Sequence, residues 1–391
     1  MDFQKVKEQD KQYIMNTYGR FDACIVKGKG AVCTDINGKE YVDFTSGIGV
    51  NSLGFADESW IKAVTEQAQS LAHISNLYYT LPDGELAQTL CEKTGYARAF
   101  FGNSGAEANE GAIKVARKYS FDKYGSGRSG IVTLVNSFHG RTVTTLAATG
   151  QDVFHNYFYP FTEGFSYAIA NNFDDFMNVV DKTTCAVMME YIQGEGGVNA
   201  LDKEYVQKVV KYCNKHDILV IADEVQTGIG RTGKLLCGEH FGVQADITTL
   251  AKGLGGGLPI GAVLVNDKLK DVLGASTHGT TFGGNPIVCA GANAVMKKVA
   301  NDAFLKEVEL KGEKIRACLA CCPEVKSLSG LGLMIGIEIE GSASELRKRL
   351  LFEKHSFTGG AGVSTVRLLP ALGITKAQAD VFLAAFKELI L

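Results

Sequence analysis

Ile218-Leu-Val-Ile-Ala-Asp-Glu-Val-Gln226 is an apolar, β-branched run followed by two carboxylates, and it decides the fold. A lysine set before glycines follows in Asp246-Ile-Thr-Thr-Leu-Ala-Lys-Gly-Leu-Gly-Gly-Gly-Leu-Pro-Ile-Gly261. Short, continuously apolar runs are typical of strands buried on both faces of a parallel sheet. Such sheets bind ligands at the carboxyl ends of their strands. Asp223 and Lys252 are therefore candidate functional residues.

This pairing of one acid with one amine suits pyridoxal phosphate as a cofactor. That cofactor needs an amine to form a Schiff base and an acid to keep its pyridine nitrogen protonated. Leu250 and Ala251 precede Lys252, and a partly desolvated site lowers the lysine pKa toward the neutral, reactive amine. Gln226 is placed to contact the phenolic oxygen of the cofactor. The alternative interpretations are a capping or loop acid at Asp223 and a surface lysine at Lys252.

Other apolar runs along the chain predict more strands of the same sheet. They are Arg98–Gly102, Gly130–Val135, Cys185–Ile192, Ile218–Asp223, Ile247–Leu250 and Gly261–Val265. Helical patterns lie between them, and Lys203–His216 places its apolar residues on one face. The alternation predicts an α/β fold with a mainly parallel central sheet sandwiched by helices.

The pattern changes near both ends of the chain, which predicts a second, smaller α+β domain. We expect residues 1–54 to form an arm and a hairpin belonging to that domain, residues 55–285 the large domain, and residues 286–391 the rest of the smaller one. The hairpin spans Gly28–Phe44, with Asn37-Gly38 as a type I′ turn. The predicted C-terminal elements are a helix at Ile287–Val299, strands at Leu331–Ile339 and Ser364–Leu369, and a closing helix at Lys376–Leu391.

Composition and charge exclude several classes of protein. The 391 residues are 46% hydrophobic and 21% charged, with a net charge of -3, which is typical of a soluble globular protein and argues against binding nucleic acid. No apolar run approaches the ~20 residues that cross a membrane, and the polar N-terminus lacks a signal-peptide core. Ten scattered cysteines, with one C-x-x-C at Cys318–Cys321 and no second pair, predict no metal site. We expect a cytoplasmic enzyme.

Two further motifs follow predicted strands. In Asn103-Ser-Gly-Ala-Glu-Ala-Asn-Glu110, Ser104 is a candidate N-cap with Glu107 completing a capping box, and Gly105 and Ala106 would then offer backbone N–H groups to a phosphate. Capping boxes open many helices, so an ordinary helix start is the alternative.

The second motif is Ser137-Phe-His-Gly-Arg-Thr142. Phe138 is placed to stack on a cofactor ring, and Arg141 to grip a carboxylate through two hydrogen bonds. A core phenylalanine beside a surface arginine is the alternative.

Taken together, the motifs resemble those of class III aminotransferases, the ornithine-type subgroup of fold-type I pyridoxal phosphate enzymes. The matching stretches occur in family order over nearly the whole chain. They are Asn103–Asn109, Phe138–Thr142, Glu190–Gly197, Ala222–Gly233, Leu250–Gly261 and His278–Pro286, supported by Tyr18–Phe21, Gly47–Gly54 and Gly332–Gly336.

The resemblance implies a role for each matching residue. Lys252 would carry the cofactor and move the proton, and Asp223 would pair with the pyridinium. The remaining implied cofactor contacts are Ser104, Gly105, Ala106, Phe138, Glu190, Val225, Gln226 and Thr281. The implied substrate contacts are Tyr18, Arg141, Glu195, Thr280 and Arg367. Thr281 would reach the phosphate of a neighbouring subunit, so the active unit implied is a homodimer with a shared site.

The resemblance also implies a reaction. The δ-amino group of N2-acetyl-L-ornithine would pass to 2-oxoglutarate in a ping-pong cycle, giving N-acetyl-L-glutamate 5-semialdehyde and L-glutamate in arginine biosynthesis. Arg141 would bind the distal carboxylate of the donor, and Arg367 the α-carboxylate of glutamate or 2-oxoglutarate. Glu195 would pair with Arg367 in the first half-reaction and release it in the second.

Several alternatives stay open on the sequence. The donor could be ornithine, succinylornithine, succinyl-diaminopimelate or 4-aminobutyrate, and a different class is an aminomutase-like or non-catalytic relative that binds the cofactor. Gly47 or Ile48 stands where ornithine aminotransferases carry an aromatic that contacts free ornithine, which weakens that donor. Tyr191 stands where the family often has proline.

Overall fold

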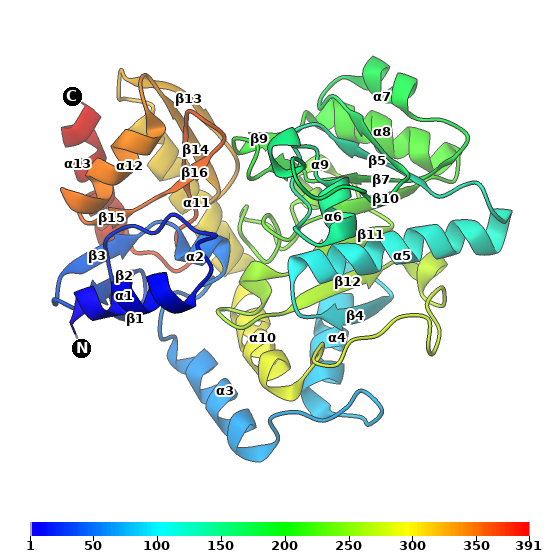
Figure 1. The fold of residues 1–391 in the computed structure, drawn as a ribbon, viewed down its shortest axis with the longest axis horizontal. Coiled ribbons are helices and arrows are strands. Elements are labelled where there is room, and N and C mark those ends of the chain that lie inside the picture. Colours follow the sequence, from blue (N-terminus) through cyan, green and yellow to red (C-terminus); the bar gives the residue numbers. More distant parts are fainter. Residues whose placement is uncertain (1, 391) are drawn as a thin grey trace.

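The computed structural model describes residues 2–390, and within them the central sheet has seven strands in the order β4-β12-β11-β10-β7-β5-β6 (Figure 1). Their bounds are β4 Arg98–Gly102, β5 Gly130–Leu134, β6 Phe165–Ala168, β7 Thr184–Met189, β10 Leu219–Asp223, β11 Ile247–Leu250 and β12 Gly261–Val265. The pairs from β11 to β6 are parallel, and β12 runs antiparallel to both of its neighbours. The prediction of a mainly parallel sheet is confirmed.

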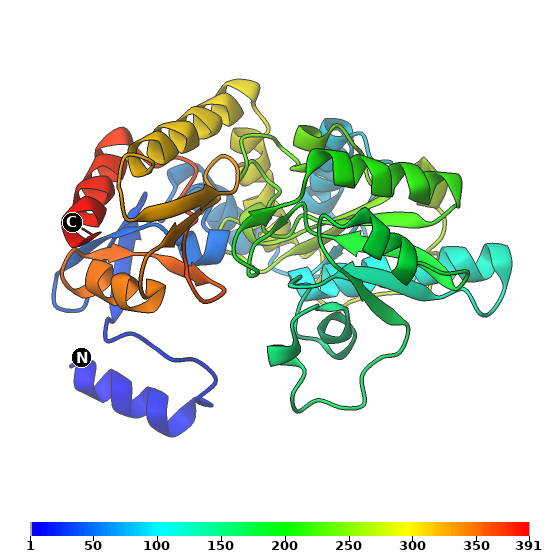
Figure 2. The ribbon, with the colours of Figure 1, turned by 90° about the horizontal axis from the view of Figure 1, so that it is seen from above.

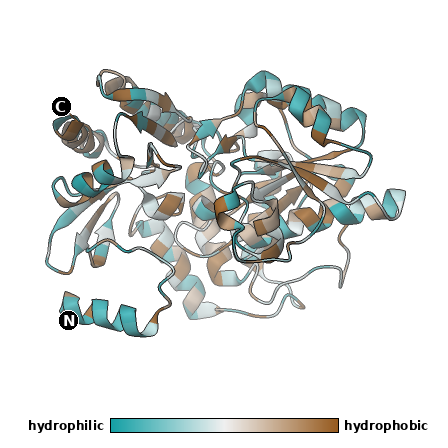
Figure 3. Ribbon diagram, turned by 45° about the horizontal axis from the view of Figure 1, so that its top comes forward, coloured by the Kyte–Doolittle hydropathy of each residue, from teal (hydrophilic) through white to brown (hydrophobic). Residues whose placement is uncertain are grey.

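Helices cover both faces of this sheet because alternate strand residues point to opposite sides. Val220 and Ala222 of β10 pack in the cluster that holds the apolar face of α8 (Lys203–Lys215). Leu219 and Ile221 pack in the cluster that holds α5 (Gly105–Tyr124). In Figure 3 the strands are mostly brown, and teal residues mark the outer faces of the helices.

Two smaller sheets form the second lobe, at the left of Figure 1. One has the order β1-β2-β3-β15 and the other β13-β14-β17-β16. Their bounds are β1 Ile25–Lys29, β2 Val32–Asp35, β3 Glu40–Asp43, β13 Val325–Ser329, β14 Ile335–Ile339, β15 Ser356–Phe357, β16 Gly359–Ala361 and β17 Thr365–Leu368. Because β15 pairs with β3, segments from the two ends of the chain share one sheet.

Longer helices connect and cover these sheets. α10 (Pro286–Val299) packs on α3 (Glu58–Ser70) and α4 (Leu81–Thr94), and α13 (Lys376–Ile390) packs on α11 (Asp302–Leu319) and α12 (Ala343–Phe352). The N-terminal α1 (Phe3–Tyr13) has no buried residue and stands apart from the body in Figure 2. The division of the chain at residues 54 and 285 stays a prediction.

Short elements fill the connections. They are α2 Ser46–Gly49, α6 Val143–Ala148, α7 Phe173–Val179, α9 Gly238–Phe241, β8 Ile192–Gln193, β9 Asn199–Ala200, and the 3₁₀ turns η1 Asp152–Phe154, η2 Lys252–Leu254 and η3 Asp267–Leu269.

The structure corrects some details of the predicted elements. The Gly38 N–H bonds the Asp35 carbonyl, and of the turn residues only Gly38 has a positive φ, 84°. The turn is therefore a type I turn followed by a left-handed glycine, not type I′, because type I′ needs two positive φ values. The hairpin region holds three strands, and the strand expected at Leu331–Ile339 begins only at Ile335. β6 was not predicted, and Leu391 of the closing helix lies outside the described residues.

Candidate active site

A cavity of about 480 Å³ opens at the carboxyl ends of β4, β5, β7, β10 and β11. It is the place where parallel sheets bind ligands. Eleven of the predicted site residues line it: Ser104, Gly105, Ala106, Phe138, Arg141, Glu190, Glu195, Asp223, Val225, Gln226 and Lys252. The sheet therefore brings together motifs that are far apart in the sequence.

Asp223 is buried at the end of β10 and is held by three donors. One carboxylate oxygen lies 2.7 Å from His139 Nδ1 and 2.8 Å from Asn109 Nδ2, and the other accepts from the Val225 N–H at 3.0 Å. Thr249 donates to the Asn109 side chain at 2.7 Å and so fixes its orientation. The acid is positioned by two side chains and one backbone N–H from different parts of the chain, which is typical of a group whose direction matters.

Glu190 is the second buried carboxyl of the cavity. It accepts from the backbone N–H groups of Phe138 and Gly194 at 2.8 and 3.0 Å. Burial raises the pKa of Glu190 to about 7, assisted by the charge of Asp223 and opposed by His139. Its two backbone contacts join the loop after β5 to the loop after β8, so Glu190 sets the position of Phe138.

The N-terminus of α5 forms another wall. Ser104 is the N-cap and accepts from the Glu107 N–H at 3.1 Å. Glu107 accepts from the Asn103 N–H at 2.5 Å, one residue earlier than in a standard capping box. A Cβ at Gly105 would lie 2.7 Å from Val225, so only glycine leaves room here. The wall offers N–H groups and the positive end of the helix dipole to an anion.

Lys252 follows β11 directly and has a left-handed backbone, with φ of 38°. Burial lowers the pKa of its ammonium group, while Glu195 opposes that shift and Arg367 adds to it. A lowered pKa increases the share of neutral amine, which is the nucleophilic form. The non-glycine residue in a left-handed conformation at this position is itself typical of functional sites.

Arg367 on β17 lies behind the cavity and is held by an ion pair. Its guanidinium donates to the two carboxylate oxygens of Glu195 at 2.6 and 3.2 Å, and to Gln226 Oε1 at 3.0 Å. Burial raises the pKa of Glu195, but the adjacent Arg367 outweighs it and the net pKa lies below its usual value. Arg367 Nε is buried without a hydrogen-bond partner among the described residues. The guanidinium therefore keeps one donor unused.

Phe138 and Arg141 also line the cavity. Phe138 is half-buried and Arg141 is exposed. The Arg141 guanidinium sits 4.0 Å from the centre of the Phe154 ring and 5.6 Å from that of Phe138. Arg141 is thus oriented by aromatic faces and leaves its hydrogen-bond donors free for an anion.

The three other predicted residues do not line this cavity. Thr280 is linked to it because Asn103 Nδ2 donates to its hydroxyl at 3.0 Å, and Thr281 beside it is exposed. Tyr18 lies in the N-terminal segment and is 72% exposed. Gly47 and Ile48 both have left-handed backbones, and Val50 is the residue of this segment that lines the cavity.

His139 and Asn109 are functional candidates that sequence reasoning missed. Both stood inside the quoted motifs, but their role depends on a contact with Asp223 that only the fold creates. His139 Nε2 is buried without a partner among residues 2–390. Among the same residues no three His, Cys, Asp or Glu side chains are grouped to hold a metal ion. In that described range, no helix has the length and apolarity to cross a membrane.

The cavity fits a flat, anionic, electron-withdrawing cofactor. It combines a fixed acid at Asp223, an aromatic face at Phe138, an anion-binding helix start at Gly105 and an amine at Lys252. These are the groups that pyridoxal phosphate requires: an acid for the ring nitrogen, a ring contact, a phosphate cradle and a nucleophile. The close approach of Val225 to Gly105, which a Cβ would prevent, holds the helix start against the cavity and supports that fit.

Comparisons with known proteins agree with this geometry. Residues 13–390 match the family described as aminotransferase class-III. The acetylornithine aminotransferase of Haemophilus ducreyi is 55% identical over 337 residues, which cover 86% of each chain. That of Caldanaerobacter subterraneus is 46% identical over 376 residues, which cover 95% of each chain.

Solved structures are similar over almost the whole chain. The ornithine aminotransferase of Toxoplasma gondii superposes with a TM-score of 0.95 at 31% identity, covering 100% of this chain and 95% of that one. A second structure of that enzyme, with a TM-score of 0.94 at 31% identity over 99% of this chain and 94% of that one, has pyridoxal phosphate at partial occupancy in its active site. The N-acetylornithine aminotransferase of Stenotrophomonas maltophilia has a TM-score of 0.84 at 31% identity, with 98% of each chain covered.

Proposed function

The chain belongs to the class-III aminotransferases, which depend on pyridoxal phosphate, and from that premise we propose its reaction and the roles of its residues. It transfers the δ-amino group of N2-acetyl-L-ornithine to 2-oxoglutarate, giving N-acetyl-L-glutamate 5-semialdehyde and L-glutamate. This is a step of arginine biosynthesis, and we place it in the cytoplasm. The names and the identity of the relatives, 55% for Haemophilus ducreyi, support this donor.

One observation carries the proposal: the Arg367–Glu195 pair adjoins a cavity that also contains Lys252 and Arg141. The donor and the acceptor carry their carboxylates at different distances from the reacting carbon. Two arginines can each serve one of them, because Arg141 lines the cavity and Arg367 is bonded to its lining residues Glu195 and Gln226. Glu195 neutralises Arg367 while the first substrate is bound, and the second substrate's carboxylate replaces Glu195.

The same proposal assigns a set of residues to the cofactor. Asp223 would hold the ring nitrogen, Phe138 and Val225 the two ring faces, and Gln226 the phenolic oxygen. Ser104, Gly105 and Ala106 would hold the phosphate, and Glu190 would support the Phe138 loop. When bound, the cofactor supplies an electron sink for the carbon that loses its proton.

The chain's own groups then carry out the remaining steps. Lys252 takes a proton from the amine-bearing carbon of the substrate and returns it at the other end of the transfer, because it is the one side-chain amine among the described residues that line the cavity. Asp223 holds its positive partner in a fixed direction, since Asn109 and Val225 donate to its carboxylate. Arg141 fixes the carboxylate of acetylornithine, Arg367 fixes the α-carboxylate of glutamate or 2-oxoglutarate, and the buried walls exclude water.

The same proposal includes a homodimer with a shared site. Exposed apolar side chains gather around Thr281: Tyr79 is fully exposed, and Leu77 and Phe282 lie on the two loops that flank it. Asn76 ties these loops together by donating to the carbonyls of Thr280 and Gly283. An apolar patch of this kind is typical of a subunit interface. It supports Thr281 reaching the phosphate site of a second copy.

The oligomeric proposal has a direct test. Tyr79→Glu should convert the dimer to monomers in analytical ultracentrifugation and reduce activity with it. A charged substitution at an exposed residue away from the patch, Glu313→Lys, is the matched control. A fully active monomer would contradict the shared site.

Free ornithine is the second candidate donor, because the ornithine aminotransferase of Toxoplasma gondii gives a TM-score of 0.95. Against it, Gly47 and Ile48 supply no aromatic side chain beside the cavity. The deciding experiment is the ratio of kcat/KM for N-acetylornithine over ornithine at saturating 2-oxoglutarate. A ratio well above one supports the proposal. A ratio below one would identify ornithine as the donor and would leave the cofactor assignments unchanged.

A further inference from the structure

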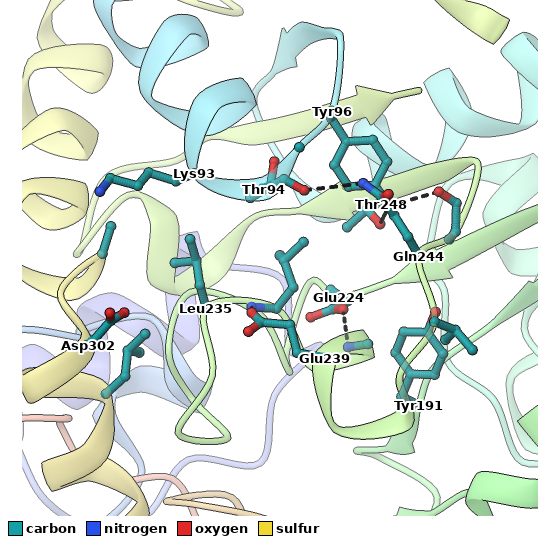
Figure 4. A pocket seen from close by; sticks show the side chains of 17 residues that line it. Lys93, Thr94, Tyr96, Tyr191, Glu224, Leu235, Glu239, Gln244, Thr248 and Asp302 are labelled. Carbon is teal, nitrogen blue, oxygen red and sulfur yellow. Dashed lines mark hydrogen bonds between the residues drawn. The ribbon is translucent and has the colours of Figure 1, made fainter. Parts of the chain in front are cut away.

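A second cavity, of about 340 Å³, is lined by Glu224, the residue that follows Asp223 at the end of β10 (Figure 4). Asp223 and Glu224 are consecutive, so their side chains leave the chain in opposite directions, and Glu224 lines this second cavity. Segments after α4, around α9 and at the start of α11 complete its wall. None of its residues has a role in the proposed reaction.

The floor of this cavity contains a polar atom without a partner. Tyr191 is 1% exposed and stacks on Phe241 at 5.0 Å, yet its hydroxyl makes no hydrogen bond within the described chain. A Cβ at Gly238, which also lines the cavity, would lie 3.4 Å from that hydroxyl. Tyr191 and Gly238 therefore lie side by side in the wall of the cavity. A buried hydroxyl without a partner costs free energy, so a bound group that satisfies it is favoured.

The other polar groups of the floor are acceptors. Tyr96 Oη lies 3.0 Å from the Ala245 carbonyl and 2.6 Å from Thr248 Oγ1. Because a carbonyl can only accept, the single Tyr96 hydrogen goes to Ala245, and Thr248 donates to Tyr96. Thr248 Oγ1 then keeps lone pairs for a donor. Glu224 accepts from the N–H groups of Cys237 and Gly238 at 2.5 and 2.9 Å and keeps further acceptor capacity.

The charges around the cavity are mainly negative. Glu239 and Asp302 carry these charges on exposed side chains, whereas Glu224 is a buried carboxyl whose pKa burial raises to about 7. Lys93 is the one cation of the described lining, and Figure 4 shows its side chain extending away from the centre. Leu235, Val243 and Leu305 provide apolar wall between the charges.

We propose that this cavity binds a small organic cation that carries N–H groups, an ammonium or a guanidinium on a short aliphatic chain. The N–H groups would donate to Thr248, Glu224 and the Tyr191 oxygen, and the aliphatic part would contact the leucine and valine side chains. The volume is that of a small-molecule site, and the apolar wall suits a carbon chain. The proposal goes beyond the amino transfer and does not depend on its donor.

Calorimetric titration of the cofactor-loaded protein with methylguanidinium chloride tests the proposal. This probe has the required charge and N–H groups. Tetramethylammonium chloride has the same charge without N–H groups and should bind at least tenfold more weakly, an estimate of about one charge-assisted hydrogen bond. Equal binding of both cations, or no binding of either, would overturn the proposal.

Variants locate the bound cation. Tyr191→Phe removes only the hydroxyl and keeps the stacking on Phe241, and it should weaken methylguanidinium binding by about two- to tenfold. The double variant Glu239→Gln, Asp302→Asn removes two negative charges, keeps an oxygen at residue 239 that can accept from the Leu236 N–H, and should weaken methylguanidinium binding by about threefold or more. Glu313→Gln, an exposed carboxylate elsewhere on α11, should have no effect.

The candidate active site is the competing location. Saturating 2-oxoglutarate should leave methylguanidinium affinity unchanged if the cation binds in the second cavity. Displacement by 2-oxoglutarate, or equal affinity in all the variants, would contradict the assignment. Failure of the proposed transfer reaction would appear separately, as absent turnover with every donor.

Discussion

Asp223 and Glu224 are adjacent acids at the end of one strand, and they occupy two very different regions. Asp223 meets side chains, His139 and Asn109, that come from other elements. Glu224 meets backbone N–H groups of Cys237 and Gly238 at the start of α9. Side-chain partners can be exchanged or respond to a ligand, whereas backbone donors fix a loop in place. The first region is therefore built for chemistry, and the second for holding structure around a cavity.

The first region depends most on Lys252. Lys252→Ala should lower kcat by about 10³-fold or more, because the variant loses the group that moves the proton. Steady-state turnover with acetylornithine and 2-oxoglutarate measures the loss. Lys93→Ala removes a lysine from the second cavity and should leave kcat near that of the parent. Similar losses of kcat in both variants would contradict the assignment of catalysis to the first cavity alone.

The two neighbouring acids give the sharpest comparison. Asp223→Asn should lower kcat by about 10²–10³-fold, since it removes the charge that faces the cofactor nitrogen and leaves His139 without its anionic partner. Glu224→Gln should change kcat by less than about tenfold, because its contacts are to backbone N–H groups. Both are measured with the same assay. Equal losses of kcat in the two variants would show that the position at the end of β10, and not the hydrogen-bond partners of each acid, determines its role.

Variants of Arg367 test whether this arginine binds the carboxylate of one substrate rather than of both. Arg367→Lys replaces a planar fork by a point charge, so kcat/KM for 2-oxoglutarate should fall by about 10- to 100-fold. The value for acetylornithine should fall less, because Arg141 binds the carboxylate of that substrate. Measuring kcat/KM for each substrate separates the two. A uniform fall would contradict the division of work between the arginines.

Glu195 is expected to have a smaller effect, on selectivity. Glu195→Gln keeps the shape of the side chain but leaves Arg367 without its counter-charge. The preference for acetylornithine over glutamate as amino donor should fall by about tenfold, with total activity changed less. Competition between the two donors in one assay gives this ratio directly. Equal losses for both donors would exclude the proposed exchange of Glu195 for a substrate carboxylate.

The smallest effect concerns stability and pH. Burial raises the pKa of Glu224 to about 7, above its ordinary value of 4.5. Between those two pH values the folded protein keeps a proton that the unfolded chain has lost, so stability should fall as pH rises from about 4.5 to 7. Glu224→Gln should reduce the slope of the unfolding free energy against pH by the equivalent of up to about one bound proton. Urea unfolding at several pH values tests it, with exposed Glu313→Gln as the control.

The sequence alone predicted much of the sheet and of the cavity. The strands at Arg98–Gly102, Ile247–Leu250 and Gly261–Val265 have the predicted bounds because each is a short apolar run between turn residues. Phe165–Ala168 was missed because exposed Ser166 and Tyr167 interrupt the apolar pattern of this edge strand. The turn at Gly38 was assigned the wrong type because the Asn-Gly pair does not specify which of its residues has a positive φ.

The sequence by itself determined which residues could do chemistry, because an acid after an apolar strand, a lysine before glycines and a serine before a helix each have local physical reasons. Only the tertiary structure decided which of these groups meet. It placed His139 and Asn109 on Asp223, joined Glu195 to Arg367 across 172 positions, and separated Glu224 from Asp223. Hydrogen bonds and ion pairs act over a few ångströms, and no spacing along the chain specifies such a distance between residues that the sheet alone brings together.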